Sequence, residues 1–336
     1  MNKSNQKLMT ENLQPNLQQH TADFQFHDFA PKSEDLSQAI QSGWSEKPKN
    51  ISPKFFYDQR GSQLFDKICQ LDEYYVTRTE IMLLEKHANE IAKNIGDNSC
   101  LIEMGSGSSK KIRLILEALR PALYMPIDIS REHLIESASL LAKDYSWLKI
   151  NAVCLDYSEQ WNLPDETPRL NRAAFFPGSS IGNFHPLQAS QLLQQMSQAL
   201  GKGGKIIIGV DLKKPEKQLN AAYNDKNGIT AEFNKNLLHR INRELFCDIN
   251  PDSFSHNAFY SHSHNRIEMH LVSNQQQVIS IQGIDYHFDK GESIHTECSY
   301  KYSASDFQQL AVNSGLTPLK CWIDNEAKFS IHLLEY

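Results

Sequence analysis

The sequence predicts an α/β protein with a doubly wound, mostly parallel sheet and a second, smaller α+β lobe. Two observations lead to this fold class. Between residues 100 and 210, short apolar segments alternate with amphipathic helical patterns, which is typical of a parallel sheet covered by helices on both faces. After residue 213 the alternation stops, and the pattern that follows predicts a separate unit inserted into the chain.

The elements of the sheet follow from apolar runs and helical spacing. We expect strands over 100–103, 123–127, 148–155, 173–176 and 205–210, and helices over 112–119, 187–200 and 305–314. Ser108 or Ser109 can cap the first of these helices. Two further strand-like runs, 319–322 and 329–334, predict a closing antiparallel hairpin at the sheet edge.

We interpret residues 214–301 as the insertion. Helical patterns over 219–223 and 230–246 precede strand-like runs over 266–272 and 277–288. We expect this insertion to pack with residues 21–79 as a substrate-binding lobe above the strand ends. Residues 80–213 plus 302–336 would then form the sheet domain. Residues 1–20 are polar and cannot bury a core, so they are predicted to be a disordered tail.

The composition narrows the class of protein. The chain has 336 residues, 40% of them hydrophobic, and a net charge of −6, which argues against nucleic acid as the main partner. The six cysteines are scattered and form no CxxC pair, as expected for reduced thiols in the cytoplasm. No apolar run is long enough for a membrane span or a signal peptide. We therefore expect a cytoplasmic monomer without a membrane partner.

Three acids stand at the ends of successive predicted strands. Glu103 lies two residues before Gly105, and Asp128 and Asp156 close the second and third strands. Asp128 follows Gly105 by 23 residues (128 − 105), near the spacing of about 20 at which an acid meets a ribose. Either later acid alone could cap the next helix, and the glycine loop alone could be a turn that binds nothing. Three acids in register favour an adenosine-containing ligand.

The glycine loop indicates which ligand this is. Its sequence GSGSSK lacks the third glycine of the GxGxxG pattern with which hydride-transfer enzymes seat a pyrophosphate. S-adenosylmethionine has no pyrophosphate, and an acid two residues before the first glycine fits its binding. The closing hairpin also suits a methyltransferase better than a dehydrogenase. A nicotinamide-dependent oxidoreductase stays open as the competing enzyme.

Several motifs in order make a resemblance specific. The chain resembles the histidine Nα-methyltransferases of ergothioneine biosynthesis over almost everything from Pro48 to the C-terminus. The motifs that carry the resemblance are KFFYDQRGSQLFD, LDEYYVTRTE, EMGSGSSKK, INAVCLDY, GSSIGN, AEFNKNLLHRINREL, RIEM and TECSYKY. The family implies a Rossmann-like fold, S-adenosyl-L-methionine as cofactor and free L-histidine as substrate.

The resemblance also implies residue roles. S-adenosylmethionine would be held by Glu103, Gly105, Lys111, Asp128, Asp156 and Tyr157. The substrate carboxylate would be bound by Asn183 and Tyr223. The imidazole would be surrounded by Glu297, Ser299 and Tyr74, with Met269 lining that pocket. Tyr57 would lie near the α-amine and is the candidate catalytic residue.

These assignments predict the Nα-trimethylation of L-histidine. The alternatives are a methyltransferase for another amino acid or histidine derivative, and a non-catalytic ligand-binding relative. We expect no metal, because His256, His262 and His264 lack a second cluster with ligand spacing and fit a polar surface loop.

Overall fold

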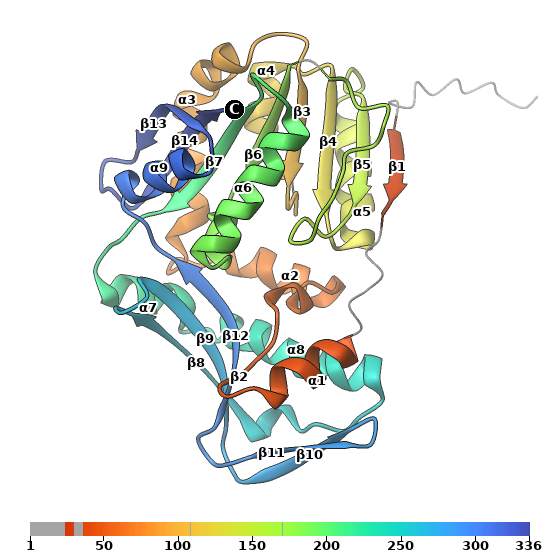
Figure 1. Ribbon diagram of the computed structural model, residues 1–336, viewed down its shortest axis with the longest axis vertical. Coiled ribbons are helices and arrows are strands. Elements are labelled where there is room, and N and C mark those ends of the chain that lie inside the picture. Colours follow the sequence, from red (N-terminus) through yellow and green to blue (C-terminus); the bar gives the residue numbers. More distant parts are fainter. Residues whose placement is uncertain (1–23, 30–35, 108, 170) are drawn as a thin grey trace, which may run out of the picture.

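The computed structural model describes residues 24–29, 36–107, 109–169 and 171–336. The predicted disordered tail, 1–20, lies outside these residues. The described chain forms an eight-stranded sheet above a four-stranded sheet (Figure 1). In spatial order, the large sheet consists of β1 (Phe24–Asp28), β5 (Ile150–Cys154), β4 (Leu123–Asp128), β3 (Cys100–Met104), β6 (Arg172–Phe176), β7 (Lys205–Asp211), β14 (Phe329–Glu335) and β13 (Thr317–Ile323).

The predicted fold class is confirmed by the strand directions. From β1 to β7 all neighbours in the large sheet are parallel. Strand β14 is antiparallel to β7, and β13 pairs antiparallel with β14, which is the predicted closing hairpin. Strand β5 begins at Ile150, two residues later than the predicted start of its apolar run.

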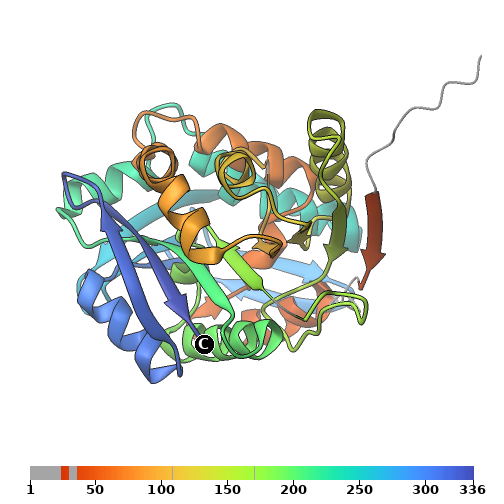
Figure 2. The same ribbon diagram turned by 90° about the horizontal axis from the view of Figure 1, so that it is seen from above.

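Alternating side chains of each strand serve the two faces of this sheet. On β3, Leu101 packs in one apolar core and Ile102 in the other, as the two-residue period of a strand requires. Helices cover both faces (Figure 2). One face carries α3 (Tyr75–Ile95), α4 (Ile112–Leu119) and α5 (Arg131–Asp144), and the other carries α6 (Pro186–Leu200) and α9 (Ala304–Asn313).

The predicted cap of α4 is wrong for Ser109. The helix begins at Ile112 after Lys111, and no side chain caps it. Ser109 has a positive φ of 55° and belongs to the turn before the helix, while Ser108 lies outside the described residues. The glycine loop therefore extends further along the chain than the capping pattern indicated.

The lower lobe is built around the small sheet. Its strands, in spatial order, are β2 (Lys49–Asn50), β12 (Ser293–Tyr300), β9 (Arg266–Ser273) and β8 (Phe254–Ser261). Its helices are α1 (Leu36–Ser45), η1 (Pro53–Phe56), α2 (Gln59–Ile68), α7 (Glu216–Tyr223), α8 (Ile229–Leu245) and η3 (Pro251–Ser253). Helix α8 contacts α1, η1 and α2 on one side and β8 and β9 on the other, so it is the core of the lobe.

Two predictions for the lobe need correction. The run 277–288 is a hairpin of β10 (Gln277–Ile281) and β11 (Ile284–Phe288), because Gln282 and Gly283 both have positive φ and form a two-residue turn. His256 does not lie in a surface loop. It is half-buried on β8, where its ring contacts Asn234 Nδ2 and the carbonyl oxygen of Tyr223.

The N-terminal boundary of the lobe is also corrected. Strand β1 lies within the segment 21–79 but pairs in parallel with β5, at the edge of the large sheet. The segment thus contributes to both units. We keep the remaining division of the chain as a proposal, supported by the contacts of α1, η1 and α2 with α8. No helix of the described residues is both long and apolar enough to cross a membrane.

Candidate active site

A cavity of about 820 Å³ lies between the carboxyl ends of the parallel strands and the lobe. This is the place where open parallel sheets bind ligands. It is lined by the following predicted site residues: Tyr57, Tyr74, Gly105, Asp128, Asp156, Tyr157, Asn183, Tyr223, Glu297 and Ser299. Glu103, Lys111 and Met269 are not among its lining residues. Tyr57 from the N-terminal segment and Glu297 from the insertion thus face one cavity.

The glycine loop approaches Tyr157 closely. Gly105 has a φ of +69°, and a Cβ at this position would lie 3.1 Å from the Tyr157 hydroxyl. The backbone N–H groups of Gly105 and Ser106 donate to the carbonyl oxygen of Ile127 at 2.8 and 3.1 Å, which fixes the loop on β4. A side chain at 105 would therefore meet both conformational strain and a clash.

Asp128 ties the glycine loop to the start of α5. Its Oδ2 accepts from the N–H of Gly107 at 3.1 Å, and its Oδ1 accepts from the N–H of Ser130 at 2.9 Å. The two carboxylate oxygens offer about four lone-pair sites, more than these backbone donors occupy, so acceptor capacity remains for a ligand in the cavity. Burial raises the pKa of Asp128 despite these donors. The capping alternative is wrong, because Ser130 is the N-cap residue of α5 and no side chain caps this helix.

Asp156 connects the sheet with the lobe. Its Oδ1 accepts from the N–H and hydroxyl of Ser158, and its Oδ2 lies 3.1 Å from Lys54 Nζ of η1. The Lys54 side chain therefore reaches across from the lobe to the strand ends. Lys54 begins the motif KFFYDQ, but sequence reasoning assigned it no role.

Glu103 and Lys111 lie behind the wall of the cavity. Glu103 is buried, accepts from the Tyr124 hydroxyl, and has its pKa raised to about 8 by burial. Burial opposes the charge on Lys111, but the Glu80 carboxylate at 2.6 Å outweighs it and raises the lysine pKa. Glu80 also accepts from the N–H of Gly178, a lining residue. Sequence reasoning missed Glu80, although it ends the motif LDEYYVTRTE.

Aromatic rings form the substrate side of the cavity. Tyr57 packs edge-on against Phe65 and Phe233, with ring centroids 5.9 and 5.8 Å apart. Tyr74 packs edge-on against Tyr223 at 6.2 Å. Burial, followed by the charge of Glu297, raises the pKa of Tyr57 well above its usual value. Its phenol stays protonated, so it can orient a ligand but cannot act as a strong base.

A β-bulge turns Glu297 toward the cavity. His295 pairs with His270 and Glu297 pairs with Met269, so Thr296 is an extra residue in β12. Its hydroxyl is shared between Asn234 Oδ1 at 2.8 Å and the carbonyl oxygen of Met269 at 3.1 Å. In a regular strand, residues 295 and 297 would share a face, and the bulge instead places Glu297 on the face of Met269. The predicted place of Met269 in the lining is wrong, because its side chain packs in the core behind Glu297.

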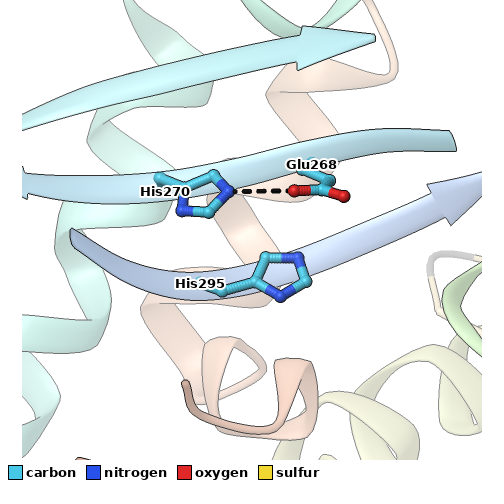
Figure 3. Close-up of side chains that lie close together, drawn as sticks. All are labelled: Glu268, His270 and His295. Atoms are coloured by element: carbon cyan, nitrogen blue, oxygen red, sulfur yellow. Dashed lines mark hydrogen bonds and ion pairs between the residues drawn. The ribbon is translucent and has the colours of Figure 1, made fainter. Parts of the chain in front are cut away.

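The opposite face of the same strands carries a polar cluster. Figure 3 shows Glu268 and His270 on β9 beside His295 on β12, with one possible ligand atom from each within 4.8 Å of the others. Arg266 already donates to Glu268 Oε1 at 2.8 and 2.7 Å, and the two imidazoles stack at 4.9 Å. Ring lone pairs of stacked imidazoles do not converge on one ion. We propose no metal here, and the expected absence of a metal stays a prediction.

Asn183 lines the same cavity as Glu297. It ends η2 (Ser180–Asn183), which packs against β12 because residue 182 is glycine. A Cβ on Gly182 would lie 2.8 Å from the carbonyl oxygen of Tyr300. Within the part of the chain that the structure describes, neither the Asn183 amide nor the Glu297 carboxylate has a hydrogen-bond partner. Both groups are therefore available to a ligand.

The ionisation of Glu297 should weigh on the stability of the protein. Burial raises its pKa from 4.5 to about 7. Between these pH values the folded chain holds a proton that the unfolded chain has released, so stability falls as pH rises and the full penalty applies above pH 7. Glu297→Gln should therefore be more stable than the wild type at pH 8 by about 3 kcal/mol. The two should be equal near pH 4.5.

Thermal melting of both proteins at the two pH values measures this difference, which corresponds to a few degrees in Tm. Glu326→Gln, on the exposed turn between β13 and β14, is the matched control. Its stability should equal that of the wild type at both pH values. A variant no more stable than the wild type at pH 8 would contradict the burial of an ionised carboxylate here.

Comparison with known proteins identifies the family. A family profile described as a histidine-specific, SAM-dependent methyltransferase matches residues 36–336. The chain belongs to this family. This methyltransferase is 37% identical over 305 residues to the histidine N-alpha-methyltransferase of Mycobacterium tuberculosis (strain CDC 1551 / Oshkosh), covering 89% of this chain and 94% of that protein.

Two further relatives agree. The histidine N-alpha-methyltransferase of Mycolicibacterium smegmatis is 34% identical, with 90% of this chain and 95% of that protein covered. Ergothioneine biosynthesis protein 1 of Neurospora crassa is 31% identical over 85% of this chain, which matches 33% of that protein. The resemblance found in the sequence is confirmed, and the oxidoreductase alternative is wrong.

The cofactor of this methyltransferase is S-adenosylmethionine, and the residues present fit it. The strand-end carboxylate of Asp128 keeps lone pairs that can accept from the ribose hydroxyls. The missing Cβ of Gly105 lets the backbone come close to the ligand. Neither feature requires a pyrophosphate at the start of α4.

Proposed function

We propose that the protein transfers three methyl groups in succession to the α-amine of L-histidine. The product is Nα,Nα,Nα-trimethylhistidine, and the reaction is the first step of ergothioneine biosynthesis. The observation that carries the proposal is the Glu297 carboxylate, which faces the cavity two residues from the Ser299 hydroxyl. The relatives named histidine N-alpha-methyltransferase support the same substrate.

The cavity offers a separate group for each part of histidine. Glu297 accepts from a ring N–H, and Ser299 meets the other ring nitrogen, with Tyr74 beside the imidazole. Asn183 donates to the α-carboxylate. In this structure the Tyr223 hydroxyl donates to Ser299 Oγ at 2.9 Å, so it must turn to reach a carboxylate. A site that hydrogen-bonds a ring rejects side chains that leave its polar groups unpaired, by up to ~10⁴-fold.

The chemistry asks little of the protein beyond alignment. S-adenosylmethionine supplies the methyl group when it is bound by the strand-end residues. Tyr57 would orient the neutral amine through its phenol oxygen, and its raised pKa excludes it as a strong base. The aromatic wall keeps water from the amine. Positioning of this kind accounts for much of the rate of bimolecular transfer reactions.

Mass spectrometry of an amino-acid mixture incubated with the enzyme and S-adenosylmethionine tests the proposal. We expect mass increases of one, two and three methyl groups on histidine alone. Methylation of another amino acid in preference to histidine would show that histidine is not the preferred substrate. Absence of any product with bound cofactor would indicate a non-catalytic relative.

Asn183→Ala should weaken the binding of every amino acid to the same extent, because each has the same α-carboxylate. Loss of a hydrogen bond to a charged group costs about 1.5–3 kcal/mol, so kcat/KM should fall about 10- to 100-fold. Histamine has the imidazole and amine but no carboxylate, and its affinity should not change. Calorimetry with both ligands measures this, and an equal loss for histamine would remove Asn183 from the carboxylate.

We also propose that the enzyme acts as a monomer in a reducing compartment, the cytoplasm. All six cysteines are free thiols, which supports this compartment. Gel filtration and quantification of thiols in purified enzyme test the two statements.

A further inference from the structure

Lys301 is a buried lysine in the lining of the substrate side of the cavity. It is 2% exposed and follows the last residue of β12. Its Nζ lies 2.7 Å from Asp211 Oδ2, 2.7 Å from Ser299 Oγ and 3.3 Å from the Tyr223 hydroxyl oxygen. An ammonium group has three N–H donors, so these three acceptors account for all of them.

This arrangement determines the direction of the Ser299 hydroxyl. Ser299 Oγ accepts from Lys301 and also from the Tyr223 hydroxyl at 2.9 Å. A serine oxygen has two lone pairs. Lys301 occupies one of them throughout, and Tyr223 occupies the other until its hydroxyl turns to the substrate carboxylate. In both cases the hydroxyl proton must point away from Lys301. Ser299 lines the cavity, so this proton is the one polar hydrogen that Ser299 offers to a ligand.

Asp211 keeps Lys301 in place. The carboxylate is fully buried and accepts from the Tyr75 hydroxyl at 2.8 Å and from Lys214 Nζ at 2.6 Å. Burial opposes the charge on Lys301, but Asp211 outweighs this and raises the lysine pKa. Lys301 is therefore a permanent cation, and its three donors stay directed at the same acceptors over the physiological pH range.

We propose that Lys301 is a positioning residue for substrate choice, which fixes the Ser299 hydroxyl as a donor toward the ligand ring. Opposite this donor, Glu297 is an acceptor. The pair then matches a ring with one bare nitrogen and one N–H, which is a neutral imidazole in a single tautomer. An imidazolium would place a second N–H against the Ser299 proton, and a pyrrole would place a C–H there. The inference rests on the proposed function and extends it to the protonation state of the ring.

The test compares histidine with its pyrrole analogues, the 2- and 3-pyrrolyl alanines, whose rings have an N–H and no bare nitrogen. The quantity measured is the ratio of kcat/KM for histidine to that for the better analogue. Ser299→Ala should lower this ratio about tenfold, because the donor is lost only for histidine. Lys301→Met should lower it to a similar extent, because Ser299 can then turn and accept. Asp211 keeps Lys214 and Tyr75 in that variant.

The double variant separates positioning from a general structural effect. If Lys301 acts through Ser299, Lys301→Met should not lower the ratio further once Ser299 is alanine. An unchanged ratio in Lys301→Met, or a second tenfold drop in the double variant, would overturn the proposal. Failure of the wild type to methylate histidine would instead refute the proposed function.

A measurement on the wild type keeps the proposal testable if Lys301→Met does not fold. Histidine labelled with ¹⁵N in the ring, bound with S-adenosylhomocysteine near pH 7, should give one bare and one N–H-type nitrogen signal from a fixed tautomer. Two N–H-type signals would show a bound imidazolium and would overturn the donor role of Ser299.

Discussion

Asp128→Ala should lower the affinity for S-adenosylmethionine by about 100-fold or more. We expect the Asp128 carboxylate to accept from two ribose hydroxyls, and hydrogen bonds to a charged group contribute about 1.5–3 kcal/mol each. The same substitution leaves the N–H of Gly107 without its acceptor, so the glycine loop loses a support as well. Calorimetry with S-adenosylmethionine measures the effect.

Two further variants interpret this result. Asp128→Asn keeps one carbonyl oxygen and should lose less affinity than the alanine variant. Asp144→Ala removes an exposed carboxylate at the end of α5 that pairs with Arg113, and it should leave the affinity unchanged. An affinity of Asp128→Ala within a factor of about two of the wild type, less than ~0.5 kcal/mol, would show that the ribose is bound elsewhere.

Glu297→Ala should lose the preference for histidine rather than activity in general. The ring N–H loses its acceptor, so kcat/KM for histidine should fall about 10- to 100-fold. Tryptophan and phenylalanine should lose less or gain, because the alanine leaves the Tyr57 and Tyr74 side of the cavity more apolar. Methyl transfer to the three amino acids by the wild type and the variant measures the change in preference.

Asn183→Ala is the comparison that gives the Glu297 result its meaning. This variant should lower kcat/KM for all three amino acids together, because Asn183 binds the α-carboxylate that they share. If Glu297→Ala also lowered kcat/KM equally for all three, Glu297 would not recognise the imidazole ring. The substitution would then affect the cavity in general and not the choice of substrate.

The large sheet could be predicted because its strands are apolar on both faces. Strands such as β3 and β6 form short continuous apolar runs between helical patterns, so their existence and parallel direction follow from the sequence. Strand β1 was missed because it is an edge strand with no fully buried residue, and its side chains show no apolar run. The strand ends, and with them Asp128 and Asp156, were placed by the same reasoning.

The substrate side could be predicted only through the resemblance. The alternation of side chains between the two faces of the sheet is interrupted in β12 by the bulge. The sequence pattern there therefore does not show which face each residue lies on. Lys54, Glu80 and Lys301 were missed because charged residues are expected on the surface, and only tertiary contacts bury them. A lysine among apolar and small residues at a strand end was the available signal for Lys301, in TECSYKY.

The bulge at Thr296 makes the effect of a deletion depend on its position in β12. Deleting Thr296 itself would leave the cross-strand pairs unchanged, His295 with His270 and Glu297 with Met269, so Glu297 and Ser299 would keep their face. Deleting Cys298 would instead bring Ser299 next to Glu297, and because side chains alternate along a strand, the two would then point to opposite faces. A single-residue deletion in β12 can therefore preserve or separate the two polar groups, a difference that comparison of aligned substitutions alone would overlook.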